Sequence, residues 1–158
     1  MSITGVTTCL WFDDQAGDAA AFYVETFPGS RVSSTSYYPI EAQKPAGSLL
    51  TVEFELFGQS FLALNASPHF QHSPAVSFQV FCDTQDEVDQ LWDAIVGGGG
   101  SESMCGWCAD RFGVSWQIIP RRLTELLSSA DSVVAGRATQ AMMGMSKIDI
   151  AALEAAVV

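Results

Sequence analysis

Two cysteines separated by two residues are the first feature of this chain that could carry out chemistry. Cys105 and Cys108 lie in the stretch CGWCADRFGVSWQ. A Cys-x-x-Cys can act as a redox pair when its first thiol lies at the start of a helix, which lowers the thiol pKa. Here the residues that follow, ADRFG, predict a turn leading into a strand, so no helix begins there. We favour two thiols that flank a hairpin turn, with a redox pair as the alternative.

Zinc binding is a second alternative, because His69 and His72 could complete a set of two cysteines and two histidines. These are the only histidines of the chain, and their stretch, SPHFQH, is typical of a loop. However, a His-x-x-His loop facing a Cys-x-x-Cys is not a familiar zinc spacing, and a single Cys-x-x-Cys is weak evidence. A loop histidine can also relay protons or cap a turn, and we expect His72 to lie on the surface.

The composition narrows the possible partners. The chain has 158 residues, 48% of them hydrophobic, with 18 acidic and 7 basic side chains and a formal net charge of -11. Such an acidic chain repels phosphate backbones and anionic lipids, which argues against nucleic-acid and membrane partners. No apolar run is long enough to cross a bilayer, and the first residues do not resemble a secretory signal, so we expect a cytoplasmic protein with free thiols.

The elements that must position these residues follow one order twice. In the first half, the patterns predict a strand, a helix and three strands, over residues 5–12, 13–29, 30–39, 48–58 and 60–66. Asp14 is the expected N-cap of the helix, and a tight turn is expected at Gly58 and Gln59. In the strand over 48–58, apolar and polar residues alternate, which predicts one buried and one polar face.

The second half repeats this order. A strand over 75–83 precedes a helix with Thr84 as its cap and Glu87 as its capping-box partner, and four glycines end it. When the two halves are laid over one another, Phe22 falls on Trp92, which indicates an internal duplication. Residues 121–158 are helical in pattern; their methionines are expected to pack against apolar neighbours or to lie at a subunit interface.

Five segments resemble one protein family closely: LWFDDQAGDAAAFYVETFPGS, GSLLTVEFELFGQSFLALNASPHF, VSFQVFCDTQDEVDQLWDAI, CGWCADRFGVSWQIIP and KIDIAALEAA. They are similar to the PhnB-like branch of the vicinal oxygen chelate superfamily, which includes glyoxalase I, extradiol dioxygenases and antibiotic-resistance proteins. Members of this branch often carry the name 3-demethylubiquinone-9 3-methyltransferase. The sequence lacks the glycine-rich loop of a methyl-donor site, so we leave open whether the protein is an enzyme.

The resemblance implies an α+β fold. Two βαβββ modules, about 5–66 and 75–120, would form a mixed, cup-shaped sheet with helices on the outside. This paired domain would occupy residues 1–120, and residues 121–158 would form a C-terminal helical extension. The resemblance also implies a homodimer, with the modules paired either within one chain or across two.

Metal-using members of the superfamily hold their ion with His and Glu side chains on the first and fourth strands of each module. In the frame DRFGVSWQ, Gln117 stands where the Glu would be, and Ser77 stands at the corresponding His position. The overlay of the two halves places Thr7 on Ser77, and the remaining position falls near Leu62 or Leu64. These neutral side chains are poor ligands for a divalent ion, so we predict no metal, no cofactor and no metal-dependent glyoxalase or dioxygenase chemistry.

Strand alternation still outlines a polar cup that could hold an unknown small molecule. Its candidate binding residues are Thr7, Trp11, Asn65, His69, Ser77, Gln79 and Gln117. Glu53, in the middle of a polar row, could act as a general base if burial raised its pKa; an exposed strand glutamate is the alternative. The main hypothesis is a metal-independent protein that binds a small molecule, and a ligand-sequestering protein of the resistance type or a zinc or thiol-redox protein are the alternatives.

Overall fold

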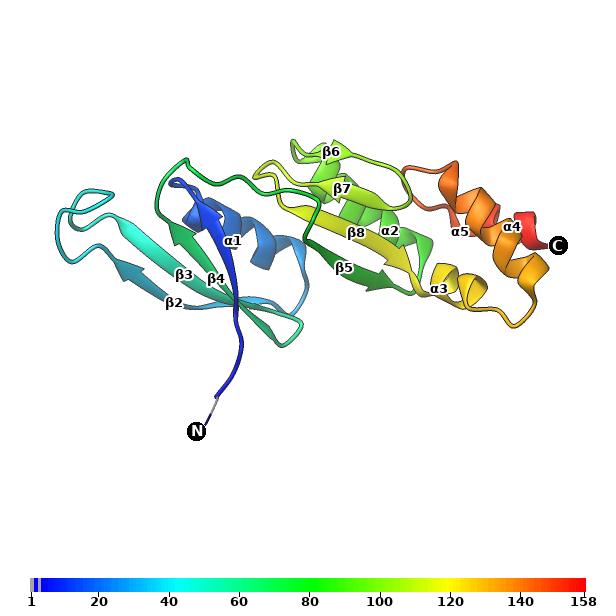
Figure 1. The fold of residues 1–158 in the computed structure, drawn as a ribbon, viewed down its shortest axis with the longest axis horizontal. Coiled ribbons are helices and arrows are strands. Elements are labelled where there is room, and N and C mark those ends of the chain that lie inside the picture. Colours follow the sequence, from blue (N-terminus) through cyan, green and yellow to red (C-terminus); the bar gives the residue numbers. More distant parts are fainter. Residues whose placement is uncertain (1, 3) are drawn as a thin grey trace. The chain divides into compact units, whose positions relative to one another are not determined.

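The computed structural model describes residues 2 and 4–158. It divides the chain into two compact units, residues up to 71 and residues 72–158, which are described separately. Each unit holds a four-stranded mixed sheet with a helix against one face (Figure 1). The predicted α+β fold of two strand–helix–three-strand modules is therefore confirmed. None of the described helices has the length and apolar character needed to cross a membrane.

The first unit contains β1 (Thr8–Phe12), α1 (Ala16–Thr26), β2 (Arg31–Tyr37), β3 (Leu49–Leu56) and β4 (Gln59–Asn65). The strand order is β1-β4-β3-β2, with β1 parallel to β4 and the other neighbours antiparallel. Tyr23 of α1 stacks on Phe54, which stacks on Phe61, and all three rings are buried. Burial of each such ring contributes about 1.5–3 kcal/mol, which fixes the helix on this face of the sheet.

Two local predictions in the first unit are wrong. Asp14 does not cap α1: Gln15 is the N-cap residue and makes no side-chain cap bond. The hairpin turn lies one residue earlier than expected, at Phe57 and Gly58, whose φ angles of 48° and 82° are both positive. Positive φ at both central residues matches the right-handed twist of a two-residue hairpin, and the glycine adopts it without strain.

The second unit contains β5 (Ser77–Cys82), α2 (Gln85–Trp92), a π-helical turn η1 (Asp93–Gly97), β6 (Ser101–Glu102), β7 (Trp107–Ala109) and β8 (Ser115–Pro120). The strand order, β5-β8-β7-β6, repeats that of the first unit. The predicted capping box is present, since the Thr84 side chain accepts from the Glu87 N–H and the Glu87 carboxylate accepts from the Thr84 N–H. The capped first turn therefore starts α2 directly after β5.

The sequence overlay of the two halves matches the first strand and the helix of each unit. The last strands of the two units are equivalent at a smaller sequence offset. Cys9 and Gln79, which the overlay places on one another, pair with Leu62 and Gln117. Leu62 and Gln117 lie closer together in the sequence than Cys9 and Gln79, because the long connection between β2 and β3 has no counterpart of equal length in the second unit. The register makes Leu62, and not Leu64, equivalent to Gln117.

Three helices follow β8: α3 (Arg121–Leu127), α4 (Ser132–Met143) and α5 (Ile150–Val157). They share an apolar core with the end of the sheet, formed by Ile119, Leu123, Leu126, Ala138, Ile148 and Leu153. Met142 and Met145 pack against this core as expected, whereas Met143 is exposed. The helices therefore form part of the second unit.

Candidate functional site

The Cys-x-x-Cys stretch does not form a reactive pair. Cys105 lies at the end of the β6–β7 connection with a φ of 60°, and Cys108 lies within β7; both thiols are free. The turn before β8 is formed by 110–113, so the expectation that the two cysteines flank that turn is wrong. Burial, together with the charge of Asp110, raises the pKa of the Cys108 thiol to about 12. A thiol that stays protonated is a poor nucleophile and metal ligand.

Zinc binding by these cysteines also lacks support. Cys108 is buried on the same side of the sheet as its β8 partner, Trp116, whereas the neighbouring Trp107 and Cys105 line a cavity. Among residues 2 and 4–158, no group of three or more His, Cys, Asp or Glu side chains could hold a metal ion. His69 is exposed in the loop at the end of the first unit, and His72 is half-buried at the start of the second.

Asp110, which the sequence patterns did not single out, builds the turn that leads into β8. Its carboxylate accepts hydrogen bonds from the backbone N–H groups of Phe112 and Val114 and, at 2.8 Å, from the indole N–H of Trp116. Gly113 completes the turn with a φ of 85°. An Asp three residues before a Gly is a turn signal that could have identified this residue. The buried turn fixes the register of the strand that carries Gln117.

Three of the predicted binding residues lie together on the second sheet. Gln79 and Gln117 are direct neighbours across the parallel strands β5 and β8, and Ser77 lies two residues before Gln79. The Gln79 side-chain N–H donates to the Gln117 carbonyl oxygen at 2.9 Å, and the Gln117 side-chain N–H donates to the Ser77 hydroxyl at 2.7 Å. The result is a chain of neutral hydrogen bonds.

This donor set does not fit the divalent ion that the superfamily uses. Ser77 and Gln117, at the positions of the His and the Glu, are neutral and already hydrogen-bonded to each other. A divalent ion at neutral pH requires imidazole, carboxylate or thiolate ligands to offset its desolvation. In the first unit, Leu62 offers no donor atom, and Thr7 is an exposed residue just before β1. A ligand-binding role for this site therefore cannot be argued from a metal ion.

A cavity of about 470 Å³ opens above the two glutamines. Residues of strands β5, β7 and β8 form its floor, and residues of helices α3 and α4 form one wall. Its lining residues are Gln79, Phe81, Cys105, Trp107, Gln117, Ile119, Leu123, Thr124, Leu127, Ser128 and Met142. The lining contains no Asp, Glu, Lys, Arg or His side chain, so the cavity suits an uncharged, partly apolar molecule.

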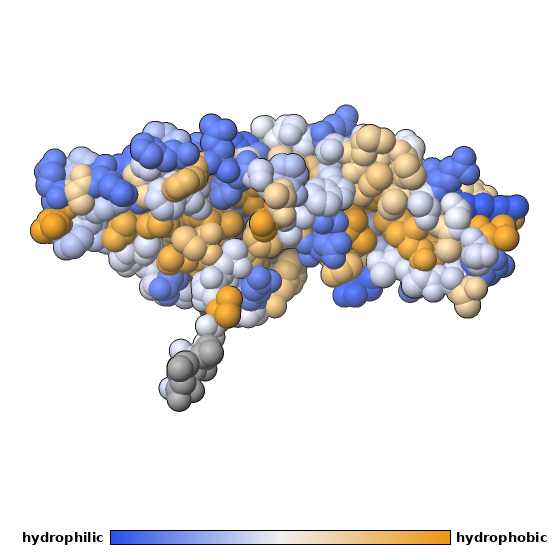
Figure 2. Space-filling view, viewed as in Figure 1, coloured by the Kyte–Doolittle hydropathy of each residue, from blue (hydrophilic) through white to orange (hydrophobic). Residues whose placement is uncertain are grey.

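The surface around these elements is not uniformly apolar. On the face shown in Figure 2, apolar side chains are interspersed with polar ones in both units. Phe81, at the rim of the cavity, is 46% exposed, and the guanidinium of Arg121 lies 5.4 Å from the centre of its ring. Arg121 also forms an ion pair with Asp83 at 3.1 Å. The positive charge of Arg121 next to the cavity is therefore already offset by the Asp83 carboxylate.

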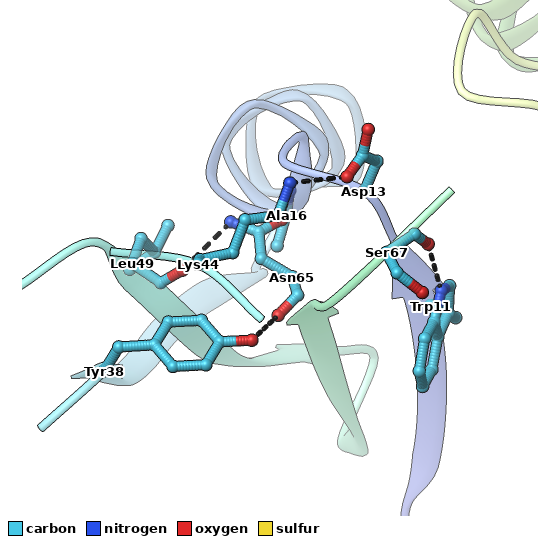
Figure 3. Close-up of polar contacts among 8 residues, drawn as sticks. All are labelled: Trp11, Asp13, Ala16, Tyr38, Lys44, Leu49, Asn65 and Ser67. Atoms are coloured by element: carbon cyan, nitrogen blue, oxygen red, sulfur yellow. Dashed lines mark hydrogen bonds and ion pairs between the residues drawn. The ribbon is translucent and has the colours of Figure 1, made fainter. Parts of the chain in front are cut away.

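Two predicted site residues of the first unit, Trp11 and Asn65, have structural contacts (Figure 3). The buried Asn65 side chain accepts a hydrogen bond from the first N–H of α1, that of Ala16, at 2.8 Å and donates to the carbonyl of Leu49. The indole N–H of Trp11 donates to the carbonyl of Ser67 at 2.7 Å. Asn65 therefore supplies the helix cap that Asp14 was expected to provide.

Glu53 is exposed in the middle of β3, where it pairs with Leu62 and Ser34. It faces away from the buried Val52 and Phe54, as the alternation predicted. The side chain is therefore not buried in the single chain. The structure therefore lends no support to a general base at this position.

A second hollow, of about 250 Å³, lies beside the start of α1 in the first unit and is lined in part by Asn65, Asp18 and Lys44. Lys44 forms an ion pair with Asp13 (Figure 3), and this hydrogen bond raises the pKa of the lysine. The lysine charge is thus already compensated. Of the two hollows, the one in the second unit has the lining more typical of a small-molecule site, with apolar side chains and a few polar groups.

Comparisons with known proteins bear on both fold and family. The model of the family described as 3-demethylubiquinone-9 3-methyltransferase matches residues 4–119. The putative 3-demethylubiquinone-9 3-methyltransferase, PhnB protein, from Bacillus cereus is 29% identical, with a TM-score of 0.67 over 74% of this chain and 99% of that chain. A protein from Pseudomonas aeruginosa is 19% identical, with a TM-score of 0.60 over 75% and 98% of the two chains.

Two further matches carry less weight. The fosfomycin resistance protein FosX from Listeria monocytogenes is 11% identical with a TM-score of 0.50, over 75% of this chain and 94% of that chain, which shows the fold alone. A 23S rRNA (uracil(747)-C(5))-methyltransferase from Serratia proteamaculans is 25% identical over 142 residues, 82% of this chain. The chain spans only 35% of the length of that curated relative.

Proposed function

Since this chain belongs to the 3-demethylubiquinone-9 3-methyltransferase family, a branch of the vicinal oxygen chelate superfamily, we propose that it binds a small organic molecule without a metal ion. The observation that carries this proposal is the cavity above the hydrogen-bonded Gln79 and Gln117. A mostly apolar hollow with a few convergent polar groups is the usual form of a small-molecule site. Ser77 supports the site by holding the Gln117 amide in place.

The lining of the cavity favours binding over acid–base catalysis. General acid–base catalysis needs a side chain that gains or loses a proton near neutral pH, such as His, Glu, Asp or Lys. Among the lining residues, only Cys105 has a titratable side chain. We therefore favour the ligand-sequestering alternative and assign no catalytic role to Glu53.

The methyl transfer in the family name has no support in the elements of this chain. Methyl-donor sites of the doubly wound type place a glycine-rich loop between a strand and a helix of a parallel sheet. Both sheets here are mixed, and the segments between the first strand and the helix of each unit, 13–15 and 83–84, contain no glycine. A family name alone does not establish the reaction.

A ligand screen tests this proposal. Thermal-shift measurements with an uncharged fragment library should identify compounds that stabilise the native chain, because a ligand that binds only the folded state raises Tm. Gln117→Leu should weaken these ligands about tenfold or more, since a ligand polar group would lose its partner. The matched control is Gln59→Leu, at an exposed position in the first unit. Equal weakening in both variants, or in neither, would contradict the proposal.

Incubation with the ligands found separates sequestration from catalysis. Mass spectrometry of the recovered compound should show it unchanged after prolonged incubation with the protein, because no His, Glu, Asp or Lys side chain lines the cavity. A product that forms in proportion to the native protein, and not with Gln117→Leu, would instead favour an enzyme.

A homodimer, as expected from the resemblance, is also proposed. Sedimentation velocity on the native chain should give a mass of about twice 16.9 kDa. A single 16.9 kDa species at all concentrations tested would refute it.

A further inference from the structure

The matched family model ends before the C-terminal helices, and these helices form part of the cavity. The family model ends at residue 119, so 120–158 lie beyond it. Five residues of this extension line the cavity: Leu123, Thr124, Leu127, Ser128 and Met142. The floor with Gln79 and Gln117 thus lies within the residues that the family model matches, and the wall lies in the extension after them.

The wall is fixed to the sheet through the Cys-x-x-Cys stretch. The backbone N–H groups of Cys105 and Gly106 donate to the carbonyls of Met145 and Ser146, at 2.7 and 2.8 Å. Gly106 has a φ of 82°, and a Cβ atom there would lie 2.9 Å from the carbonyl oxygen of Ile118. The unusual backbone of this stretch therefore allows the close approach of the loop between α4 and α5.

Contacts with α2 hold the same loop. The Gln85 side chain donates to the carbonyl of Ile148 and accepts from the N–H of Ile150. Lys147 forms an ion pair with Asp89 at 2.7 Å, which raises the pKa of the lysine and lowers that of the aspartate. The extension is thus anchored to both the sheet and its helix, and the cavity wall has a defined position.

The floor of the cavity offers hydrogen-bonding groups, and its wall offers mainly apolar side chains. Each glutamine amide has two N–H donors and one carbonyl acceptor, and the hydrogen bonds described use one N–H of each. A second N–H on each amide and the Gln79 carbonyl oxygen are left for a ligand. The wall offers the apolar Leu127 and Met142 and two hydroxyls, without a charged group.

We propose that α3 and α4 are the specificity element of this cavity, which selects an uncharged ligand with an apolar body and a carboxamide-like polar edge. This inference rests on the proposed binding function. The polar edge hydrogen-bonds the glutamine amides, and the apolar body packs on Leu127 and Met142. An anionic ligand is rejected, because no lining side chain offers a positive charge to replace its lost hydration.

Benzamide and benzoate form a matched pair of probes, since they share one ring and differ in charge. Ligand-observed NMR titrations should show that the native chain binds benzamide about tenfold or more tightly than benzoate. Leu127→Lys should abolish or reverse this preference by placing a cation in the wall. Gln140→Lys is the matched control: it adds the same charge at an exposed position of α4 that does not line the cavity, so the preference should stay unchanged.

A second pair of variants tests the wall by adding a large side chain that would fill part of the cavity. Thr124 is exposed on α3 and lines the cavity, so Thr124→Trp should weaken benzamide about tenfold by filling the space of its ring. Gln140→Trp should leave it unchanged. Because both positions are exposed, neither variant should measurably lower the urea midpoint of unfolding.

The possible failures are distinguishable. If the native chain binds benzoate as tightly as benzamide, or if both lysine variants change the preference equally, the helices do not select by charge and the inference is wrong. If Gln117→Leu weakens benzamide while Leu127→Lys and Thr124→Trp change nothing, the binding function stands and the inference alone falls. If neither probe shows binding that depends on Gln117 up to about 10 mM, both fall.

Discussion

Gln117 shows how one side chain can change the chemistry of a shared fold. A carboxylate at this position could only accept hydrogen bonds and would attract a cation, whereas the amide both accepts from Gln79 and donates to Ser77. The two neighbours are therefore held by the same neutral group that makes this position a poor metal ligand. The polar part of the floor is fixed in position without any net charge.

Cys108 allows a prediction about pH. Its pKa rises from 9.0 to about 12 on folding because of burial and the nearby Asp110. Between these values the unfolded chain releases the thiol proton and the folded chain keeps it. The contribution of Cys108 to the free energy of unfolding should therefore be full below pH 9 and decline as the pH rises from about 9 to about 12.

Urea unfolding of the native chain and of Cys108→Ala, at pH values from 7 to 11, measures this effect. The native midpoint should fall more steeply above pH 9 than that of Cys108→Ala, although the variant is less stable throughout because of the cavity it creates. Parallel curves for the two proteins would show that Cys108 does not titrate as predicted.

At the level of helices and strands, local patterns gave correct predictions where the signal lies within one element. The capping box of α2 depends on Thr84 and Glu87, three residues apart, and it is present. The cap of α1 depends on Asn65, 49 residues after Ala16 in the chain. A local sequence pattern cannot reveal a contact between residues so far apart, so the pattern predicted Asp14 as the cap, which is wrong.

The candidate site was predictable to a similar extent. Period-2 alternation correctly placed Gln79 and Gln117 on one face, because each lies within a regular strand. The wall of the cavity was not predicted, since the pattern of residues 121–158 identifies helices but not the surface on which they pack. The backbone of Cys105, with its positive φ, depends in the same way on its hydrogen bond to Met145.

The structural role of Asn65 leads to a prediction. Asn65→Ala should lower the free energy of unfolding by about 1–3 kcal/mol, because the buried Ala16 N–H and the Leu49 carbonyl lose their partner. Asn65→Asp keeps the acceptor for α1 and should lose less. Neither variant should change ligand binding in the second unit. Chemical denaturation measures the first effect, and weaker ligand binding without a loss of stability would contradict the structural role.

The turn at Gly106 leads to a second prediction. Gly106→Ala should lower the stability by about 1–3 kcal/mol, because its φ is positive and the new Cβ would lie within 3.1 Å of both Ile118 and Ile148. Hydrogen exchange should also increase in 145–150. Gly136→Ala is the matched control, since nothing lies within 4 Å of the new Cβ on α4 and the change should raise helix stability. Similar effects of both variants would refute this anchor.

The charge of the entire chain bears on the partial similarity to an rRNA methyltransferase. The seven basic side chains are outnumbered by 18 acidic ones. In the part of the chain that the structure describes, at least five of the seven form ion pairs with carboxylates: Arg31, Lys44, Arg121, Arg122 and Lys147. Nucleic-acid binding depends on lysine and arginine side chains that replace the counterions of the phosphates. Few cations of this chain are available for that exchange.

We therefore predict that the chain does not bind RNA. Filter binding with a labelled RNA oligonucleotide at about 50 mM salt, where electrostatic attraction is strongest, should give no saturable retention up to about 10 μM protein. A basic RNA-binding protein under the same conditions provides the positive control. Retention of RNA by the native chain, with an affinity that falls steeply as salt rises, would show a cationic surface that this charge distribution does not provide. Such a result would also move the search for a ligand from the cavity of the second unit to that surface.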